Sequence, residues 1–190
     1  MNAKEGDTVW LEIIHAMTLT HQGKHAPERY ATAEKELRRI IERFRRIEAT
    51  GSWYDEQIRH FAIKCSLAQI AHMQHDWEEA QRRWADVVAY GMESVTDWKG
   101  ENYYIEVAKY SLADAQCSAD MDPRVVIPPL VNTIRAIEGK RVTWMLGMGT
   151  FWLDYVHERM APMADVLSKL NTTDTVEAKL AVLSVVAHEL

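Results

Sequence analysis

The sequence predicts an all-α protein built from stacked helical hairpins, and three observations support this prediction. Apolar residues recur at steps of three and four over most of the chain, and no alternating strand pattern of useful length occurs. Glycine and proline residues are few and lie between the periodic runs. Residues 15–23 are echoed by residues 67–75, and an aromatic residue and an alanine follow each copy. Such repetition is typical of proteins made of stacked helical units.

The composition indicates one soluble globular domain with a substantial core. The chain has 190 residues, of which 47% are hydrophobic and 26% charged, and its net charge of −6 argues against a nucleic-acid partner. No run approaches the roughly 20 apolar residues that span a bilayer, and the N-terminus is polar. We therefore expect no membrane association and a cytoplasmic location, with Cys65 and Cys117 as reduced thiols inside helices.

The first three helices follow from their caps and apolar stripes. A helix over about 7–21 can be capped at residue 7 or 8. The next, about 28–49, has the clearest stripe in the chain and ends before Gly51. The third, about 53–73, carries apolar residues on more than one side, which predicts a heavily buried helix.

Three further elements complete the part up to residue 139. Asp76 caps a helix over about 77–90, which ends before a glycine, and a helix over about 101–119 follows a polar connector. The next element opens at residues 122–123. The paired prolines at 128–129 either kink this helix or delay its start, because proline damages a helix interior.

The last fifty residues depart from this pattern. Residues 140–149 are rich in glycine and methionine and form a break. A helix over about 150–170, bent near Pro162, and a last helix over about 175–188 follow it. We expect residues 1–139 to form the repeats and residues 140–190 to cap them within one compact domain.

One stretch, residues 54–92, resembles a tetratricopeptide repeat. It has a large residue followed by a small one, a tight turn, an aromatic residue and an alanine at the matching positions, namely Leu67, Ala68, Ala71, Trp77, Ala80 and Trp84. Weaker copies precede and follow it at spacings longer than the usual 34 residues, as in kinesin-light-chain-like proteins. The resemblance implies a right-handed solenoid of about three hairpins closed by a C-terminal helical pair.

The same resemblance implies a non-enzymatic interaction module, a scaffold or adaptor that binds a peptide or helix in a concave groove. The groove-facing positions carried over from the family are Met17, Thr20, Cys65, Gln69, His72, Val107, Tyr110, Asp114 and Cys117. We assign partner contacts to six of them: Met17, Thr20, Gln69, His72, Tyr110 and Asp114. They lack the basic residues with which some family members hold a terminal carboxylate.

A dense cluster of aromatic residues and methionines follows the repeats. Trp144, Met148, Trp152 and Tyr155 are its candidate binding residues. The cluster fits a core layer that caps the last repeat, a protein interface or homo-oligomer surface, or a small-ligand pocket. The alternative function is therefore an all-α small-ligand-binding regulator or enzyme with a pocket near residues 144–160.

We assign no catalytic residue, metal site or cofactor. His72 and His75, with Asp76 beside them, lack the further ligands of a metal site. Asp154 and Glu158 share a helix face and fit an exposed charged surface better than an acid–base pair. No phosphate-binding glycine loop or nucleophile motif is present.

Overall fold

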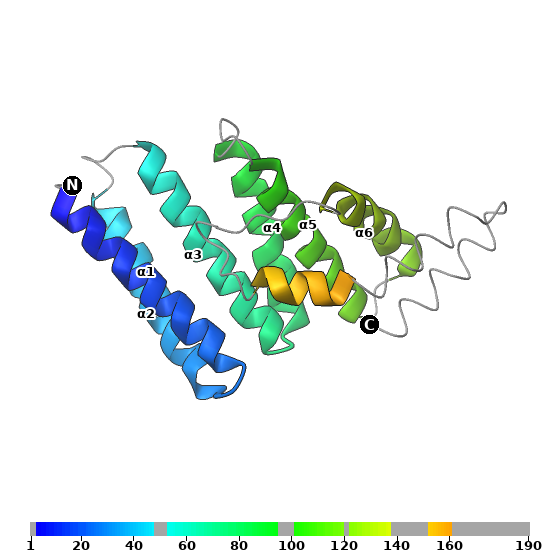
Figure 1. Ribbon diagram of the computed structural model, residues 1–190, viewed down its shortest axis with the longest axis horizontal. Helices are drawn as coiled ribbons and strands as arrows, with labels where there is room; N and C mark the ends of the chain where they lie inside the picture. Colours follow the sequence, from blue (N-terminus) through cyan, green and yellow to red (C-terminus); the bar gives the residue numbers. More distant parts are fainter. Residues whose placement is uncertain (1–2, 48–52, 95–100, 120–121, 138–151, 161–190) are drawn as a thin grey trace.

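The computed structural model describes residues 3–47, 53–94, 101–119, 122–137 and 152–160, and this part of the chain is helical with no strand. The all-α prediction is therefore confirmed. The helices are α1 (Ala3–Gly23), α2 (Glu28–Ile47), α3 (Trp53–Met73), α4 (Trp77–Ser94), α5 (Glu101–Ser118) and α6 (Pro123–Ile137). Residues 152–160 form a further helical segment (Figure 1).

The six helices pack as three successive pairs. α1 packs along α2, α3 along α4, and α5 along α6. Further packing of α2 and α1 on α3, and of α4 on α5, joins the pairs in chain order (Figure 1). The connections after α1, α3 and α5 are short, so the two helices of each pair run in opposite directions.

The hydrogen bonds of the turn between α3 and α4 explain why α3 ends and α4 begins at these residues. The Asp76 N–H donates to Ala71 O at 3.0 Å, and the His75 N–H donates to His72 O at 3.0 Å. His75 has a φ of 59°, the left-handed conformation that usually closes such a motif with glycine. Asp76 Oδ1 then accepts the Glu79 N–H at 3.3 Å, which confirms Asp76 as the cap of α4.

Two helix ends differ from the sequence prediction. α1 begins at Ala3, before the predicted caps at residues 7 and 8, and α4 continues past the buried Gly91, where a side chain would crowd Ile105 and Phe61. Of the two alternatives for the paired prolines, the delayed start is excluded, since α6 begins at Pro123 and continues through Pro128 and Pro129. Both inner prolines are exposed, so water can reach the backbone carbonyl groups that lose their helical donors.

α3 lies between two hydrophobic cores. One face contributes Ala62, Ile63 and Ile70 to a core with α1 and α2. The other contributes Phe61, Cys65, Ala68 and Ala71 to a core with α4, α5, α6 and residues 152–160. The predicted burial of this helix on more than one side is confirmed. Cys65 and Cys117 are both free thiols, as expected.

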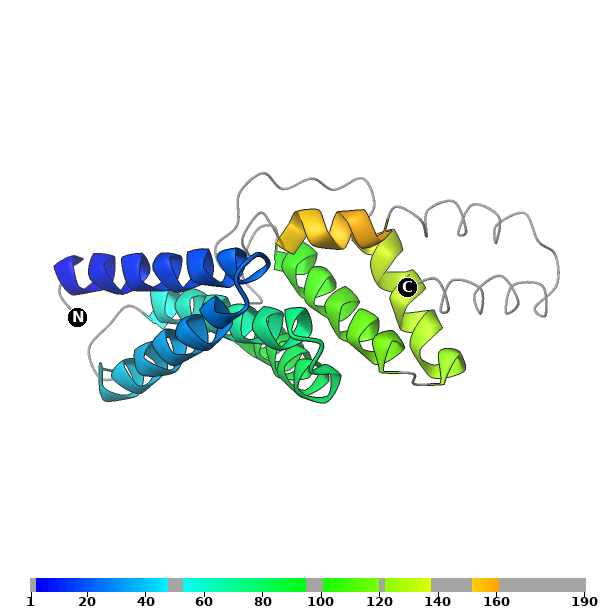
Figure 2. The same ribbon diagram turned by 90° about the horizontal axis from the view of Figure 1, so that it is seen from below.

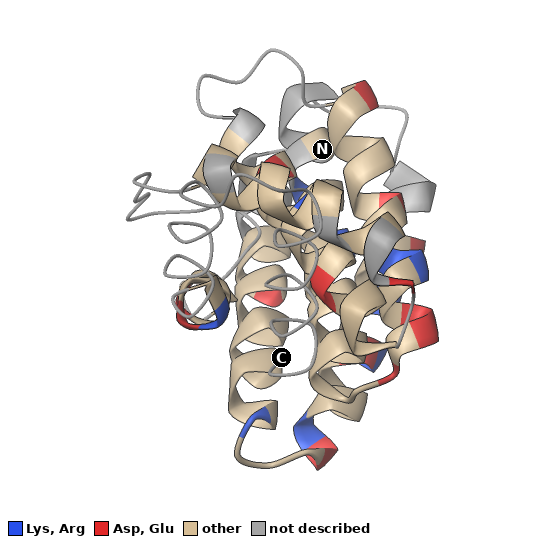
Figure 3. Cartoon of the chain, turned by 90° about the vertical axis from the view of Figure 1, so that its right-hand side faces the viewer, with Lys and Arg blue, Asp and Glu red and all other residues tan. Residues whose placement is uncertain are grey.

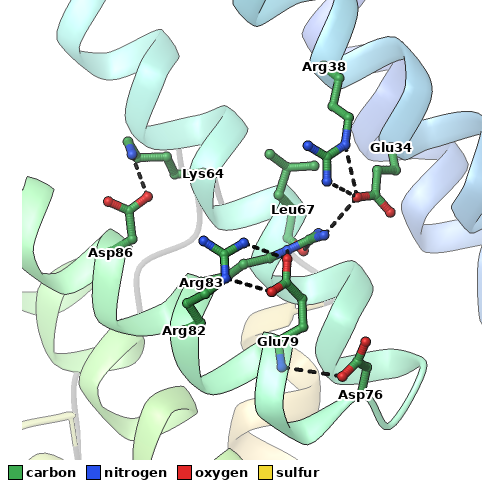
Figure 4. A network of polar contacts seen from close by, with 9 residues as sticks. All are labelled: Glu34, Arg38, Lys64, Leu67, Asp76, Glu79, Arg82, Arg83 and Asp86. Carbon is green, nitrogen blue, oxygen red and sulfur yellow. Dashed lines mark hydrogen bonds and ion pairs between the residues drawn. The ribbon is translucent and has the colours of Figure 1, made fainter.

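Arg83 on α4 joins three helices. Its guanidinium donates to Glu34 Oε1 on α2 at 2.7 Å, to Leu67 O on α3 at 2.7 Å and to Glu79 Oε1 on α4 at 2.6 Å (Figure 4). Its side chain is only 11% exposed, whereas that of Arg82, which also pairs with Glu79, is 69% exposed. Hydrogen bonds from Arg82, and then from Arg83, lower the pKa of Glu79 to about 2.

The basic residues of α2 are interleaved with acidic partners. Arg38 pairs with Glu34 at 2.6 Å, and Arg43 pairs with Glu12 of α1 at 2.9 Å. Figure 3 shows Lys and Arg close to Asp and Glu on the described helices seen in that view. None of the described helices is both long and apolar enough to cross a lipid bilayer.

Gly23→Ala is expected to destabilise the protein by about 1–3 kcal/mol, because the added methyl group would overlap the buried ring of Tyr30. Urea denaturation of the wild type and the variant measures this loss. In a Tyr30→Leu background the same substitution should cost clearly less. An equal cost in both backgrounds would contradict the overlap as its cause.

Arg83→Met retains most of the apolar stem but removes the three contacts to α2, α3 and α4. We expect it to lower the free energy of unfolding by about 1–3 kcal/mol. Arg82→Met is the matched control, since its side chain is largely exposed, and it should change stability by less than about 0.5 kcal/mol. Similar losses of stability in both variants would mean that the contacts of Arg83 with α2, α3 and α4 do not stabilise the protein.

Candidate functional site

Residues 152–160, here called the docked segment, lie across α4 and α5 near the C-terminal end of α3 (Figures 1 and 2). Several side chains of these helices contact it, among them Tyr103 of α5, which lies 3.3 Å from His157. We call four of them the docking face: His72 of α3, Trp84 of α4, and Ser111 and Asp114 of α5. The contacts join residues more than 40 positions apart in the chain.

Helical spacing brings the contacting side chains together. On the docked segment, Trp152, Tyr155 and Arg159 are separated by three and four residues and therefore share one side of the helix. Ser111 and Asp114 are likewise three residues apart on α5. The site is thus made by three side chains of one helix against neighbouring turns of the others.

A buried carboxylate lies at the centre of the site. Arg159 Nη2 donates to Asp114 Oδ1 at 2.8 Å, and His72 Nε2 lies 3.1 Å from Asp114 Oδ2. Because a carboxylate only accepts, Nε2 carries the proton in this hydrogen bond. The Tyr155 hydroxyl lies 3.2 Å from the same nitrogen and 3.5 Å from Asp114 Oδ2. The Asp114 side chain is 0% exposed and that of His72 is 1% exposed.

The charges of this cluster reinforce one another. Burial alone would raise the pKa of Asp114, but the hydrogen bond and charge of His72 and those of Arg159 outweigh it and lower this pKa. Burial would lower the pKa of Arg159, and the neighbouring carboxylate outweighs that effect and raises it. Asp114 and Arg159 are therefore an ion pair at neutral pH.

The neighbouring phenols and thiol stay neutral. Burial, and then the negative charge of Asp114, raise the pKa of both Tyr155 and Tyr110. The same two causes raise the pKa of the Cys117 thiol to about 11. These groups therefore act as uncharged side chains at neutral pH, and the thiol is not an activated nucleophile.

Aromatic rings form the apolar part of the site. Trp152 is fully buried and stacks on Trp84 with ring centroids 5.3 Å apart and on Tyr155 at 4.7 Å. The His72 ring meets Trp152 edge-on at 5.1 Å, and Trp77 of α4 meets His72 at 5.2 Å. Trp152 Nε1 donates to Ser111 Oγ at 3.1 Å, so its polar group is also satisfied.

Several buried polar atoms of α3, α4 and α5 make no hydrogen bond within the part of the chain that the structure describes. Within the described residues, Gln69 Nε2, His72 Nδ1, Trp84 Nε1 and the Tyr110 hydroxyl are buried and have no hydrogen-bond partner. A buried donor or acceptor without a partner costs about 1–3 kcal/mol.

The structure brings together three of the six predicted groove residues. His72 and Asp114 contact the docked segment. Burial raises the pKa of Tyr110, one turn before Asp114, and Asp114 and Arg159 lie near enough to affect this pKa as well. Gln69 lies one turn before His72 on α3. All four are buried rather than open to solvent.

Met17 and Thr20 lie elsewhere. Met17 packs against the core of α1, α2 and α3, and the buried Thr20 hydroxyl donates to Ala16 O within α1 at 3.0 Å. Of the predicted aromatic cluster, Trp152 and Tyr155 belong to the docked segment. Trp144 and Met148 lie outside the described residues.

The sequence analysis missed Arg159 and Ser111. Arg159 lies four residues after Tyr155 and seven after Trp152, and this spacing places a cation on the aromatic side of that helix. Ser111 lies one turn before Asp114. These spacings, which are visible in the sequence, could have identified both residues as members of the site.

Metal binding has no candidate here: in the described ranges, no group of three or more His, Cys, Asp or Glu residues could hold a metal ion. Comparison with known proteins adds no assignment, since no protein-family model, curated protein or solved structure matches the chain. The geometry of the docked segment therefore carries the functional argument.

Asp114→Asn is expected to lower the free energy of unfolding at pH 7 by about 1–3 kcal/mol, because Arg159, whose side chain is 24% exposed, loses its buried counter-ion. The lowered pKa of Asp114 means that its charge stabilises the fold above the ordinary value of 3.8, and that this contribution is lost as the pH falls through the lowered pKa. Denaturation of both proteins from pH 7 to pH 3 should show the difference shrinking.

Asp154→Asn is the matched control, since Asp154 is exposed on the same helical segment. It should leave stability within about 0.5 kcal/mol of the wild type. A loss for Asp114→Asn that stays constant over the whole pH range would show that packing, not charge, is responsible.

Proposed function

We propose that this protein is a non-enzymatic protein–protein interaction module, a scaffold or adaptor of the tetratricopeptide-like type. In this proposal α1 to α6 form three hairpins of a right-handed solenoid, and the docking face is part of a groove that accepts a peptide helix. The observation that carries the proposal is the docked segment itself. A helix already occupies this surface, held by stacked rings and by the ion pair of Arg159 with Asp114.

The residue composition of the contact resembles that of protein interfaces. Tryptophan, tyrosine and arginine are the residues that most often dominate binding energy at such interfaces, and all three occur on one side of the docked segment. This composition supports the proposal that the docking face receives a helix of similar chemistry.

The alternative function, a small-ligand-binding regulator or an enzyme, has less support. Trp152 is packed between Trp84 and Tyr155, where the pocket proposal would need it to line a cavity. The raised pKa values of Tyr110, Tyr155 and Cys117 favour neutral side chains over activated ones. We also propose a reducing compartment such as the cytoplasm, which the two free cysteines support.

Selection from a displayed library of helical peptides tests the proposal. The full chain carrying Trp152→Ala, whose docked segment has lost its main anchor, should retain more peptides than the wild type. Binding of the selected peptides should then fall about tenfold or more when Asp114→Asn is added, since a buried charge partner is lost.

Leu11→Ala is the control, because Leu11 is exposed on α1, in the other core's helix pair. It should leave peptide binding unchanged. Peptides that bind equally well with and without Asp114→Asn would place their site elsewhere on the protein, and the groove would then be wrong.

A further inference from the structure

We propose that the partner helix carries a tryptophan, an aromatic residue three positions later and an arginine seven positions later, and that the docked segment is an intramolecular competitor with this pattern. The inference rests on the proposed function and specifies the chemistry of its partner. It follows from what the docking face requires of any helix that covers it.

The first requirement is a cation. Asp114 is completely buried and retains its charge, and removing one partner of such a pair leaves an uncompensated charge. Arg159 supplies the cation from the docked segment. A helix that replaces this segment must bring a cation to the same position, and arginine fits better than lysine because its guanidinium is planar and more weakly hydrated.

The second requirement is an indole. Trp152 fills the space against Trp84, and its Nε1 donates to the Ser111 hydroxyl, whose own proton goes to Val107 O. Phenylalanine would fill part of this space but could not donate to Ser111. The following aromatic residue is needed because Tyr155 covers the other face of the indole at 4.7 Å.

The docked segment does not pair every polar group beside it. The buried Tyr110 hydroxyl, whose pKa is raised by burial and is also affected by the nearby Asp114 and Arg159, makes no hydrogen bond to another group among the described residues. A partner helix with a polar side chain opposite this hydroxyl would add a hydrogen bond that the docked segment does not make. The docked segment has the advantage of belonging to the same chain, which raises its effective concentration.

The experiment uses a fluorescent peptide with the sequence of residues 150–161, stapled through positions 154 and 158, which are exposed and one turn apart. The staple is needed because short isolated helices are unstable in water. The peptide is titrated into the full chain carrying Arg159→Gln. We expect binding about tenfold tighter than to the wild type, because the internal competitor is weakened.

Two controls isolate the arginine and the docked segment. A second peptide, with glutamine in place of its arginine, should bind the Arg159→Gln chain about tenfold more weakly than the first. The chain carrying Glu158→Gln changes an exposed charge of the same segment and should behave like the wild type. Trp152→Leu provides a second chain with a weakened segment if Arg159→Gln does not fold.

The outcomes separate this inference from the proposed function. Equal affinity for the two peptides would overturn the requirement for arginine and leave the groove intact. If hydrogen exchange shows the docked segment released in a variant chain and neither peptide binds, the groove itself is wrong. Tight binding to the wild-type chain, equal to that of the variants, would overturn competition by the docked segment.

Discussion

The buried carboxylate of Asp114 is the interaction on which the candidate site depends. A charge removed from water costs several kcal/mol unless partners compensate it closely. Those partners come from two other places in the chain, His72 on α3 and Arg159 on the docked segment. The position of α5 relative to α3, and the orientation of the docked segment across both, must therefore satisfy this one group together.

Much of the fold could be predicted from local sequence patterns, because each helix carries its own signals. The bounds of α3 agree with the prediction, and Asp76 identifies the start of α4. The errors occurred where packing outweighs local preference. Gly91 reads as a helix end, yet α4 uses it for close approach to Phe61 and Ile105. For the exposed prolines of α6 the sequence left a kink and a delayed start open, and the structure excludes the delayed start.

The site was predictable only in parts. Carrying repeat positions onto this chain selected His72 and Asp114, and the density of aromatic residues selected Trp152 and Tyr155. That the two groups belong to one site could not be inferred, because helical periodicity describes neighbours within a helix. The pairing of Asp114 with Arg159 spans 45 positions and has no local signature. Residues predicted for the groove and residues predicted for the aromatic cluster thus contact one another in the structure.

The position of α3 between two separate cores has a consequence for folding cooperativity. One face of this helix orders α1 and α2, and the other orders the helices that hold the docked segment. The two groups therefore share α3 as a common template while burying different side chains. Native proteins open in such contiguous units. Transient opening of the first pair of helices would leave the indole stack and the buried carboxylate in place, so this protein can fluctuate at one end and keep its docked segment bound at the other.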